Sequence, residues 1–552
     1  MAVGELCRRG AVVSLSLGLL GSILAFFPTT MLPAERFALP QEMVLHLAAL
    51  VSALLALLAA NSGPQMDEID LGAGLFVLLG LVSAFSTPNP WLAWRSLGLS
   101  ASTVLLFWVA RGVAWGKHRR TVLWIAALAV GAAAAVALLE AYGALDGLSP
   151  PGRRPGGTIG NRNRLAHLLV LALPVVWWGI ARTRQRVQLW VLLGCAAASS
   201  AVVVLSRSRG AWLALGALGI FGVGAYLAGR GNAAISGGRM AAFIAVVALS
   251  GLAAVIVPNR LAWRSDDAYA DTFRRLTDYR EGTGRGRLVQ YLNTLRMVRD
   301  SPMLGVGPGN WMIYYPRYAS PGDPSFEPRA SVPVNRLPHG DWIGFAAERG
   351  LPALVLLGAT GGLLVLRSWR KSRQRQSRTA QTSALVVAGT LLVLLVVGTF
   401  DPALQTPAVA CWISVTVGVL TPRPSAALRL GRRGGLLLTT GMLAISTVAA
   451  YHTTLRIWAG SHYATRPTLE RLERAVQIYP GDYDAHLRLQ VYWSRRGECE
   501  QARPHFRAAQ RLYPTAWLPH FLWQRCQPAT RPSHSEASAR GAGSASPHSA
   551  AP

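Results

Sequence analysis

Long apolar runs follow one another along most of this 552-residue chain, and they constrain its fold more than any other feature. A helix needs roughly 20 mostly apolar residues to cross about 30 Å of hydrocarbon. About thirteen runs approach that length, and they predict an all-α polytopic membrane protein with about 12–13 transmembrane helices. Two of them, 71–87 and 408–421, are short and flanked by Gly or Pro. The runs lie near 11–30, 41–61, 71–87, 97–115, 121–142, 165–181, 187–205, 210–228, 240–257, 342–366, 383–399, 408–421 and 435–452.

The composition excludes an ordinary soluble protein, because 51% of the residues are hydrophobic and only 15% are charged. The formal charge of +29 comes almost entirely from arginine. Cytoplasmic loops of membrane proteins are normally basic, and the chain carries no nucleic-acid-binding motif. We therefore expect membrane lipid, and no nucleic acid, among its partners.

The arginines and lysines of the short loops indicate the orientation in the membrane. Basic loops at Lys117–Arg120, Arg182–Arg186 and Arg367–Arg378 predict a cytoplasmic N-terminus, and one acidic loop, Asn61–Asp70, argues weakly against it. The same count places the long polar stretch 258–339 on the outer side, which in a bacterium is the periplasm. The expected location is the bacterial inner membrane, with the C-terminus also periplasmic.

Five segments follow from these patterns. We expect transmembrane helices over 1–257, one large periplasmic loop over 258–339, the remaining transmembrane helices over 340–452, a small periplasmic helical module over 453–526 and a disordered tail over 527–552. The tail is a Ser/Ala/Pro/His/Gly mixture with nothing to bury.

A self-match with a period of 34 residues marks the C-terminal module. Tyr479-Pro480 recurs as Tyr513-Pro514, and Ala475 recurs as Ala509. This is the tetratricopeptide period, and so short an array is expected to pack on the membrane domain or on a periplasmic protein partner. We expect removal of the chain after Thr465 to change partner choice or stability more than chemistry.

Two cysteines lie in the same module. In an oxidising compartment Cys499 and Cys526 could form a disulfide, and two unpaired thiols are the alternative.

Arginines also occur on the outer side, where the positive-inside rule does not favour them. One group is Asn161, Arg162, Asn163 and Arg164, in which the asparagines can cap a helix and the arginines can complete an anion site. A second is Arg207 and Arg209, in a tight turn between two runs. Charge at a membrane boundary needs a partner, and phosphate at headgroup depth is the natural one.

The large loop holds the remaining candidates. Arg285 and Arg287 begin a predicted helix with an apolar face at helical spacing, and an amphipathic helix lying on the membrane surface accounts for that pattern. The glycine-rich stretch 301–311 lacks the Gly-Lys-Ser/Thr of a Walker loop. His339 closes the loop, and neighbouring arginines would keep it neutral, as a general base requires. The predicted apolar face comprises Leu288, Tyr291, Leu292, Leu295 and Val298.

Asp266, Asp267 and Asp271 offer an alternative chemistry, because a carboxylate cluster can hold a divalent metal. No matching ligand group occurs elsewhere, so we expect no metal and no cofactor.

Taken together, several segments resemble the O-antigen ligase and Wzy polymerase superfamily over roughly residues 40–420. They are the Asn-x-Asn-x-x-Ala segment at Asn161, Ser208-Arg209-Gly210, the run from Gly286-Arg287 to Asn310, and His339 to Leu351. Two positions depart from the family pattern: Gly340 replaces the usual Asn after the histidine, and Tyr291 replaces a Trp. They put acceptor preference in question but leave the class intact.

The resemblance implies a metal-independent, inverting glycosyltransferase whose donor is a glycan on undecaprenyl diphosphate. Arg209 and Arg287 would bind the diphosphate and stabilise it as it leaves, and His339 would take the proton of the acceptor hydroxyl. The acceptor would be lipid A core, another glycan or a protein. The further substrate-binding residues implied are Arg207, Asn161, Asn163, Arg162, Arg164 and Arg285.

Three alternatives stay open. Two are relatives in the same class, a Wzy-type polymerase and a protein O-oligosaccharyltransferase, and the helical module slightly favours a protein acceptor or partner. The third is a transporter or flippase for the same lipid-linked sugar. A transporter should show internal repeats and charged midplane helices, whereas the polar residues here gather at one face.

Overall fold

The computed structural model describes residues 2–526 with internal gaps, and the regular structure of the described part is helical. One isolated antiparallel bridge joins Phe326 and Val334. The predicted all-α class is confirmed. The predicted disordered tail lies outside the described residues. Undescribed are residues 1, 29–30, 33–34, 60–64, 146, 229–236, 264, 266, 277, 279–281, 333, 376, 423–431 and 527–552.

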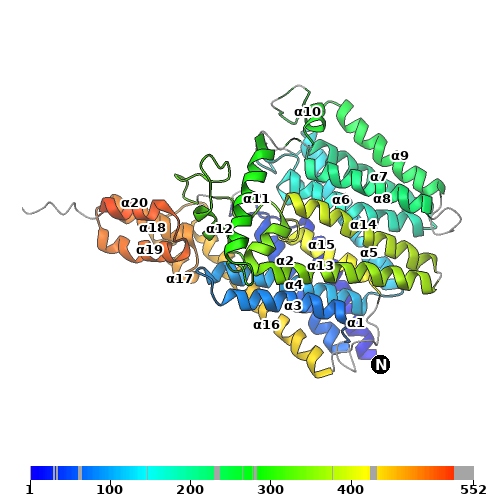
Figure 1. The fold of residues 1–552 in the computed structure, drawn as a ribbon, viewed down its shortest axis with the longest axis horizontal. Helices are drawn as coiled ribbons and strands as arrows, with labels where there is room; N and C mark the ends of the chain where they lie inside the picture. Colours follow the sequence, from blue (N-terminus) through cyan, green and yellow to red (C-terminus); the bar gives the residue numbers. More distant parts are fainter. Residues whose placement is uncertain are drawn as a thin grey trace, which may run out of the picture.

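Every predicted apolar run coincides with a helix of the bundle in Figure 1. Within the described residues, eleven of these helices are long and apolar enough to cross a membrane. The other two, α3 and α15, arise from the two short runs. The helices are α1 (Ala2–Leu24), α2 (Ala38–Ala59), α3 (Glu68–Ala84), α4 (Pro90–Val113), α5 (Lys117–Ala141), α6 (Arg162–Arg182), α7 (Arg186–Leu205), α8 (Arg209–Ala228), α9 (Gly237–Ile256), α13 (Asp341–Arg375), α14 (Arg378–Phe400), α15 (Pro407–Leu420) and α16 (Arg432–Tyr463).

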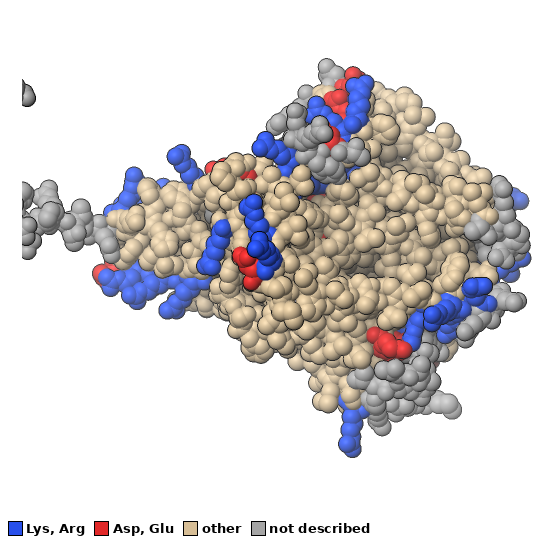
Figure 2. Space-filling model, in the orientation of Figure 1, with Lys and Arg blue, Asp and Glu red and all other residues tan. Residues whose placement is uncertain are grey.

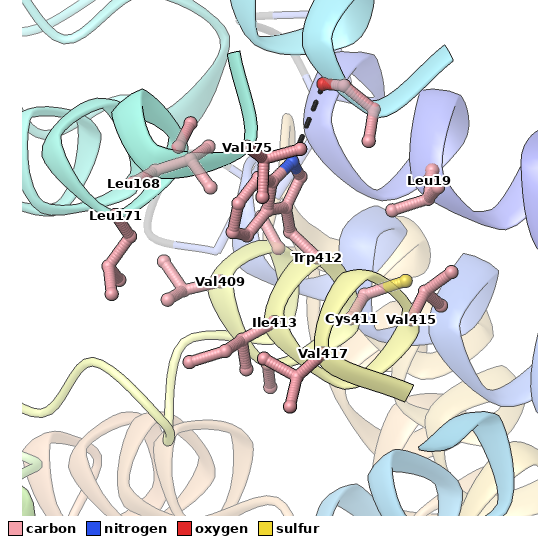
Figure 3. Close-up of a cluster of buried hydrophobic side chains, with 14 of the residues drawn as sticks. Leu19, Leu168, Leu171, Val175, Val409, Cys411, Trp412, Ile413, Val415 and Val417 are labelled. Carbon is pink, nitrogen blue, oxygen red and sulfur yellow. Dashed lines mark hydrogen bonds between the residues drawn. The ribbon is translucent and has the colours of Figure 1, made fainter. Parts of the chain in front are cut away.

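The short helix α15 lies in the middle of the bundle. All of its residues are buried, and Trp412 at its centre packs among side chains of α6 such as Leu168 and Val175 (Figure 3). The Trp412 indole donates a hydrogen bond to the carbonyl oxygen of Ala126 in α5 at 3.4 Å. Because protein rather than lipid surrounds α15, the thickness of the hydrocarbon layer does not set its length.

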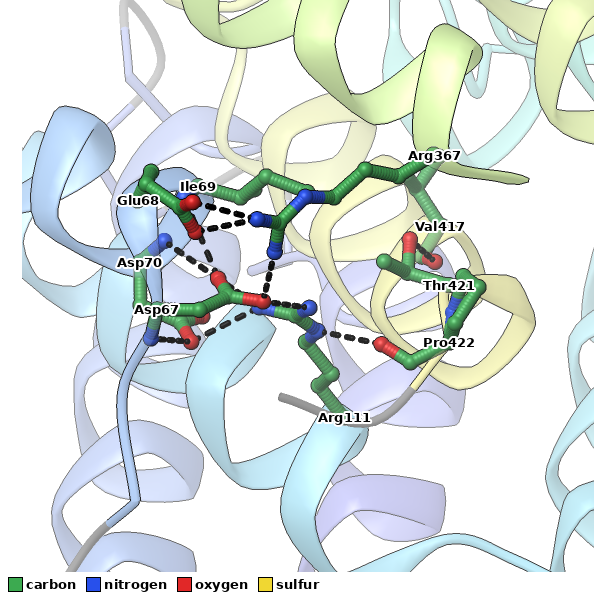
Figure 4. Close-up of polar contacts among 9 residues, drawn as sticks. All are labelled: Asp67, Glu68, Ile69, Asp70, Arg111, Arg367, Val417, Thr421 and Pro422. Carbon is green, nitrogen blue, oxygen red and sulfur yellow. Dashed lines mark hydrogen bonds and ion pairs between the residues drawn. The ribbon is translucent and has the colours of Figure 1, made fainter. Parts of the chain in front are cut away.

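Acidic residues at the start of α3 form ion pairs with arginines from two other helices (Figure 4). Arg111 of α4 contacts Asp67 at 2.6 Å and Asp70 at 2.7 Å, and Arg367 of α13 contacts Asp67 at 2.6 Å and also Glu68. The acidic loop that argued against the predicted orientation is therefore paired with arginine from basic segments. Its charge does not oppose the positive-inside count.

Charged side chains gather at the ends of the molecule. On the face shown in Figure 2, Lys, Arg, Asp and Glu leave a broad uncharged band across the bundle. One end, here called the α11 end, carries α10 (Ala268–Arg274), α11 (Gly282–Asp300), α12 (Trp311–Tyr314) and the C-terminal helices, and α1 begins at the opposite end (Figure 1). Short 3-10 turns at the α11 end are η1 (Pro151–Arg153), η2 (Gly157–Ile159) and η3 (Tyr315–Arg317).

Four C-terminal helices form two successive helix pairs beyond the bundle (Figure 1). Ala475 and Ala509, which share the 34-residue spacing, are both fully buried. A disulfide joins Cys499 and Cys526, so the pairing that the sequence left open is present. Assignment of these helices to the tetratricopeptide class stays a prediction. They are α17 (Leu469–Ile478), α18 (Tyr483–Arg495), α19 (Cys499–Leu512) and α20 (Trp517–Cys526).

Candidate active site

Asp401, directly after α14, is the centre of a cluster of ionisable side chains at the α11 end. The Arg287 guanidinium, in the second turn of α11, donates to its two carboxylate oxygens at 3.2 and 3.4 Å. His339 places Nδ1 3.7 Å from one oxygen, and His167 of α6 places Nε2 3.6 Å from the other. Three parts of the chain far apart in sequence thus converge on one carboxylate.

The Asp401 carboxylate is charged despite its burial. Burial would raise the pKa of Asp401, but Arg287 and the two histidines outweigh it and hold that pKa well below its usual range. An ionised carboxylate favours the histidine tautomer that carries hydrogen on the nearer nitrogen, which for His339 is Nδ1. Nε2 of His339 then carries the lone pair, which accepts a hydrogen bond from the Asn335 amide at 3.4 Å in this structure.

Exposure distinguishes the two histidines. The His339 side chain is 28% exposed, whereas that of His167 is 1% exposed. The Ser208 hydroxyl contacts His167 Nε2 at 3.3 Å, so His167 fills the interior behind Asp401. His339 is the histidine that a substrate can reach.

The backbone at Gly340 lets His339 reach Asp401. Gly340 has φ +141°, and a Cβ at this position would lie 2.4 Å from the Tyr291 hydroxyl and 3.0 Å from the Thr399 carbonyl oxygen. The Tyr291 hydroxyl donates to that same carbonyl. The two departures from the family pattern, Gly340 and Tyr291, therefore meet in space. No side chain fits at 340 while Tyr291 holds this position.

Arg207 and Arg209 hold the loop around α10 rather than Asp401. The Arg207 Nε donates to the Thr272 hydroxyl at 2.8 Å, and its guanidinium lies 4.8 Å from the Trp263 ring centroid. Burial lowers the pKa of Arg207. Arg209 donates to the carbonyl oxygens of Arg275 and Asp278, both at 2.9 Å. The structure thus brings Arg287 and His339 together and places Arg209 on a neighbouring segment.

Asn161 caps α6, as its sequence indicates. Its side-chain oxygen accepts from the backbone N–H groups of Asn163 at 3.0 Å and Arg164 at 3.3 Å. The Arg162 guanidinium lies 4.8 Å from the centroid of the same Trp263 ring as Arg207.

Arg164 lies within electrostatic range of Asp401. Its charge acts on Asp401, and among the described residues its guanidinium makes no hydrogen bond or ion pair. Arg164 is therefore a cation next to the cluster that can accept an anionic ligand. Arg285, by contrast, is exposed on α11.

The apolar face predicted for α11 is only partly the buried one. Leu288, Leu292 and Leu295 are about half exposed (48, 51 and 49%), whereas the polar Asn293 and Thr294 are buried. Polar partners in the following loop account for this: Asn293 donates to Asp323 at 2.9 Å, and Trp311 donates to Thr294 at 3.1 Å. An amphipathic helix on the membrane surface was among the expectations from sequence, and leucine at a membrane boundary can face lipid without penalty.

The glycine-rich stretch 301–311 fastens the loop to a break in α13. Helix α13 is interrupted at Gly350, where φ is +83°. The N–H groups of Val306 and Gly307 donate to the carbonyl oxygens of Ala347 (2.8 Å) and Glu348 (3.0 Å), just before the break. A Cβ on Gly305 would lie 2.5 Å from the Ala347 oxygen. These glycines serve close backbone packing.

The alternative metal site includes Asp266, which lies outside the described residues. Of its other members, Asp271 accepts a hydrogen bond from the Ser265 hydroxyl at 2.5 Å.

Sequence reasoning missed Asp401 and His167. Both lie in or directly after an apolar run, and an ionisable residue at membrane depth is a functional candidate by default. The same rule that selected His339 would have found them. Their proximity to Arg287 cannot be read from the sequence, because α6, α11 and α14 are far apart along the chain.

Together, the fold and this cluster define a polytopic helical membrane protein with a charged site at one end of its bundle. Residues 194–358 match the model of a family described as O-antigen ligase. This match covers less than a third of the chain, and it supports the O-antigen ligase and Wzy superfamily and a glycan-processing membrane protein of the ligase/polymerase type. The search of curated proteins found no match.

The matched stretch is shorter than the resemblance seen in the sequence. It includes Ser208, Arg287 and His339 but neither the Asn161–Arg164 segment nor Asp401. Asp401 joins the site through the geometry alone, whereas the Asn161–Arg164 segment was selected from its sequence pattern.

Proposed function

We propose that the protein is an O-antigen ligase-type glycosyltransferase. It moves a glycan from undecaprenyl diphosphate to an acceptor hydroxyl, on lipid A core or a similar acceptor, at the periplasmic face of the bacterial inner membrane. The observation that carries this proposal is the position of Asp401 between Arg287 and His339. It places an anion-binding group and a proton acceptor side by side, as departure of a diphosphate and attack by a hydroxyl require.

His339 is the proposed general base. Its Nε2 takes the proton of the acceptor hydroxyl while the acceptor oxygen bonds to the anomeric carbon. Asp401 holds the ring through Nδ1 and stabilises the imidazolium that forms. The proton then passes to water, and the base returns to its starting state.

Arginine is the proposed counter-charge for the leaving group. As the bond from the anomeric carbon to the phosphate oxygen breaks, negative charge accumulates on the diphosphate, and attack from the opposite side inverts the configuration. Arg287 is paired with Asp401, which also contacts the base, and Arg164 interacts electrostatically with the same carboxylate. Arg162, Arg207 and Arg209 extend the positive region toward α10.

Asp401 and the diphosphate compete for Arg287 in this scheme. Without donor, Arg287 is paired with Asp401 at 3.2 Å. A bound diphosphate attracts the guanidinium with more charge and bidentate geometry. The Asp401 carboxylate then no longer shares its charge with Arg287. Donor binding therefore strengthens the interaction of Asp401 with His339.

Single substitutions test the proposal. His339→Ala and Arg287→Ala are expected to abolish transfer of a labelled glycan from its lipid carrier, while the proteins still insert in the membrane. Arg299→Ala is the matched control, because Arg299 is an exposed arginine at the other end of α11. Wild-type transfer by both site variants would refute the proposal. Activity is also expected to persist in EDTA, and loss of activity that magnesium restores would refute metal independence.

The nature of the product separates the ligase from its relatives. Cells carrying an inactive variant are expected to accumulate long lipid-linked polymer. Accumulation of single repeat units would indicate a Wzy-type polymerase, and unmodified protein would indicate a protein O-oligosaccharyltransferase. A lipid-linked oligosaccharide transporter would move the donor across the membrane without forming a glycosidic bond.

A further inference from the structure

The C-terminal helices pack on the loop that leads to His339. The Tyr513 hydroxyl donates to the carbonyl oxygen of Met312, and the Thr515 hydroxyl donates to that of Ile313, both at 3.0 Å. The Tyr483 hydroxyl donates to the carbonyl oxygen of Ser331 at 2.9 Å. Three side chains of the module thus bind backbone at both ends of the loop segment 312–331.

Apolar packing accompanies these hydrogen bonds. Ile313, Tyr513 and Ala516 are buried against one another, with 3, 2 and 1% of their surface exposed. Leu92 of α4 and Val332 of the loop complete the cluster. The loop is therefore enclosed between the module and the membrane helices.

A second attachment lies three residues before His339. Arg336 forms an ion pair with Glu35, which also accepts from Arg456 of α16 at 2.6 Å. Arg336 also lies 3.9 Å from Asp484 of α18. Glu35 lies in the loop before α2. The helices that begin the C-terminal module, this loop and the loop that leads to His339 therefore meet at this point.

Asparagine side chains close the arrangement at the start of the loop. The Asn89 amide donates to the carbonyl oxygen of Leu512, at the end of α19, at 2.8 Å. Asn89 and Asn310 also form two hydrogen bonds, both of 3.1 Å. The Asn89 backbone N–H donates to the Asn310 side-chain oxygen, and the Asn310 side-chain amide donates to the Asn89 carbonyl oxygen. The loop segment 311–336 is thus fastened where it begins and where it ends.

We propose that α17–α20 form an intramolecular positioning element that sets the placement of His339 relative to Asp401. Tyr483, Tyr513 and Arg336 are positioning residues in this scheme. The proposal rests on the proposed function for its kinetic consequences. It revises the expectation from sequence that removal of the chain after Thr465 leaves the chemistry largely intact.

The structure also predicts which step the module affects. Arg287 is on α11, and Asp401 and Arg164 are at the ends of membrane helices, so donor binding does not depend on the module. His339 follows the fastened segment directly. Loosening the segment is therefore expected to slow proton transfer and leave donor affinity unchanged.

The test uses the full chain with the double substitution Tyr483→Phe and Tyr513→Phe. It removes two hydroxyl groups but keeps both rings in the apolar cluster, so the module stays folded. We expect faster hydrogen–deuterium exchange over 312–336, unchanged exchange in α11, and a fall in kcat of about tenfold with the donor KM unchanged. Tyr492→Phe, in the same module and away from the loop, is the matched control.

Arg336→Gln is an independent variant, because the Arg336 side chain is 49% exposed and its loss leaves no large cavity. It is expected to lower kcat at constant donor KM, and Arg336→Lys is expected to restore most of the rate. Unchanged exchange over 312–336 in the double variant, or raised exchange with unchanged kcat, would overturn the proposal. If the wild-type protein had no transferase activity, only the proposed function would be contradicted. Hydrogen–deuterium exchange would still test the fastening of the loop, because it does not depend on activity.

Discussion

Replacement of Asp401 by asparagine separates the two proposed roles of its carboxylate. Asparagine has the same shape but no charge, so His339 loses the group that stabilises its protonated form. Arg287 loses its partner at 3.2 Å and becomes free for the diphosphate. The variant is therefore expected to affect the base and the anion site in opposite directions.

The size of the effect on the base follows from the distance of 3.7 Å between His339 and Asp401. Two unit charges at that separation interact by about 4.5 kcal/mol at an effective dielectric constant of about 20. The His339 side chain is 28% exposed, and solvent screens part of this interaction. We expect a loss of about 2–3 kcal/mol in the transition state, which lowers kcat by about 30- to 150-fold.

The donor KM distinguishes this mechanism from general damage to the site. With Arg287 released, the KM for the lipid-linked donor is expected to fall in Asp401→Asn, whereas Arg287→Ala is expected to raise it. The assay is transfer of labelled glycan by purified protein in lipid nanodiscs, with Glu327→Gln, an exposed carboxylate of the same loop, as the control. A wild-type kcat, or a raised donor KM, in Asp401→Asn would refute the reasoning.

Three further predictions concern the supporting structure. Burial would raise the pKa of Glu35, but Arg456, Arg95 and Arg336 lower it from 4.5 to about 2. The ionised Glu35 carboxylate should thus contribute on the order of 3 kcal/mol to the free energy of unfolding above pH 4.5, and this contribution should be lost as the pH falls toward 2. Melting temperatures measured over this pH range check the prediction. Gly340→Ala is expected to lower transfer more than tenfold, because a Cβ there would strain the backbone and crowd the Tyr291 hydroxyl; wild-type transfer by Gly340→Ala would contradict this. Arg111→Met is expected to destabilise the protein by about 3–5 kcal/mol, because it leaves buried Asp67 and Asp70 with too little positive charge; an unchanged melting temperature would contradict this.

The arrangement of helices along the chain could be predicted well from the sequence, because the thickness of the hydrocarbon layer imposes a length that apolar runs must match. Whether lipid or protein surrounds each helix could not be predicted from the sequence. A short apolar run such as 408–421 looks the same whether lipid or protein covers it, and only the structure shows that α15 is enclosed by other helices.

The site could be predicted only in part. Arg287 and His339 were found from local patterns, and both lie next to Asp401 in the structure. Asp401 and His167 escaped notice because each stands alone among apolar neighbours, without a local motif. The contacts of Arg207 and Arg209 with residues in and after α10 depend on the path of the loop backbone, which no residue pattern specifies.

The turn between α19 and α20, which carries Tyr513 and Thr515, is among the last described parts of the chain to be synthesised. Arg287, His339 and Asp401 are all made and inserted before it. In the proposed scheme, a ribosome that stalls, or a protease that trims the C-terminus, thus leaves a protein with its proposed reacting groups present but the loop before His339 unfastened. Such a fragment would occupy the membrane and bind donor lipid with little turnover, so completion of translation and export of the C-terminus would together act as the checkpoint for activity.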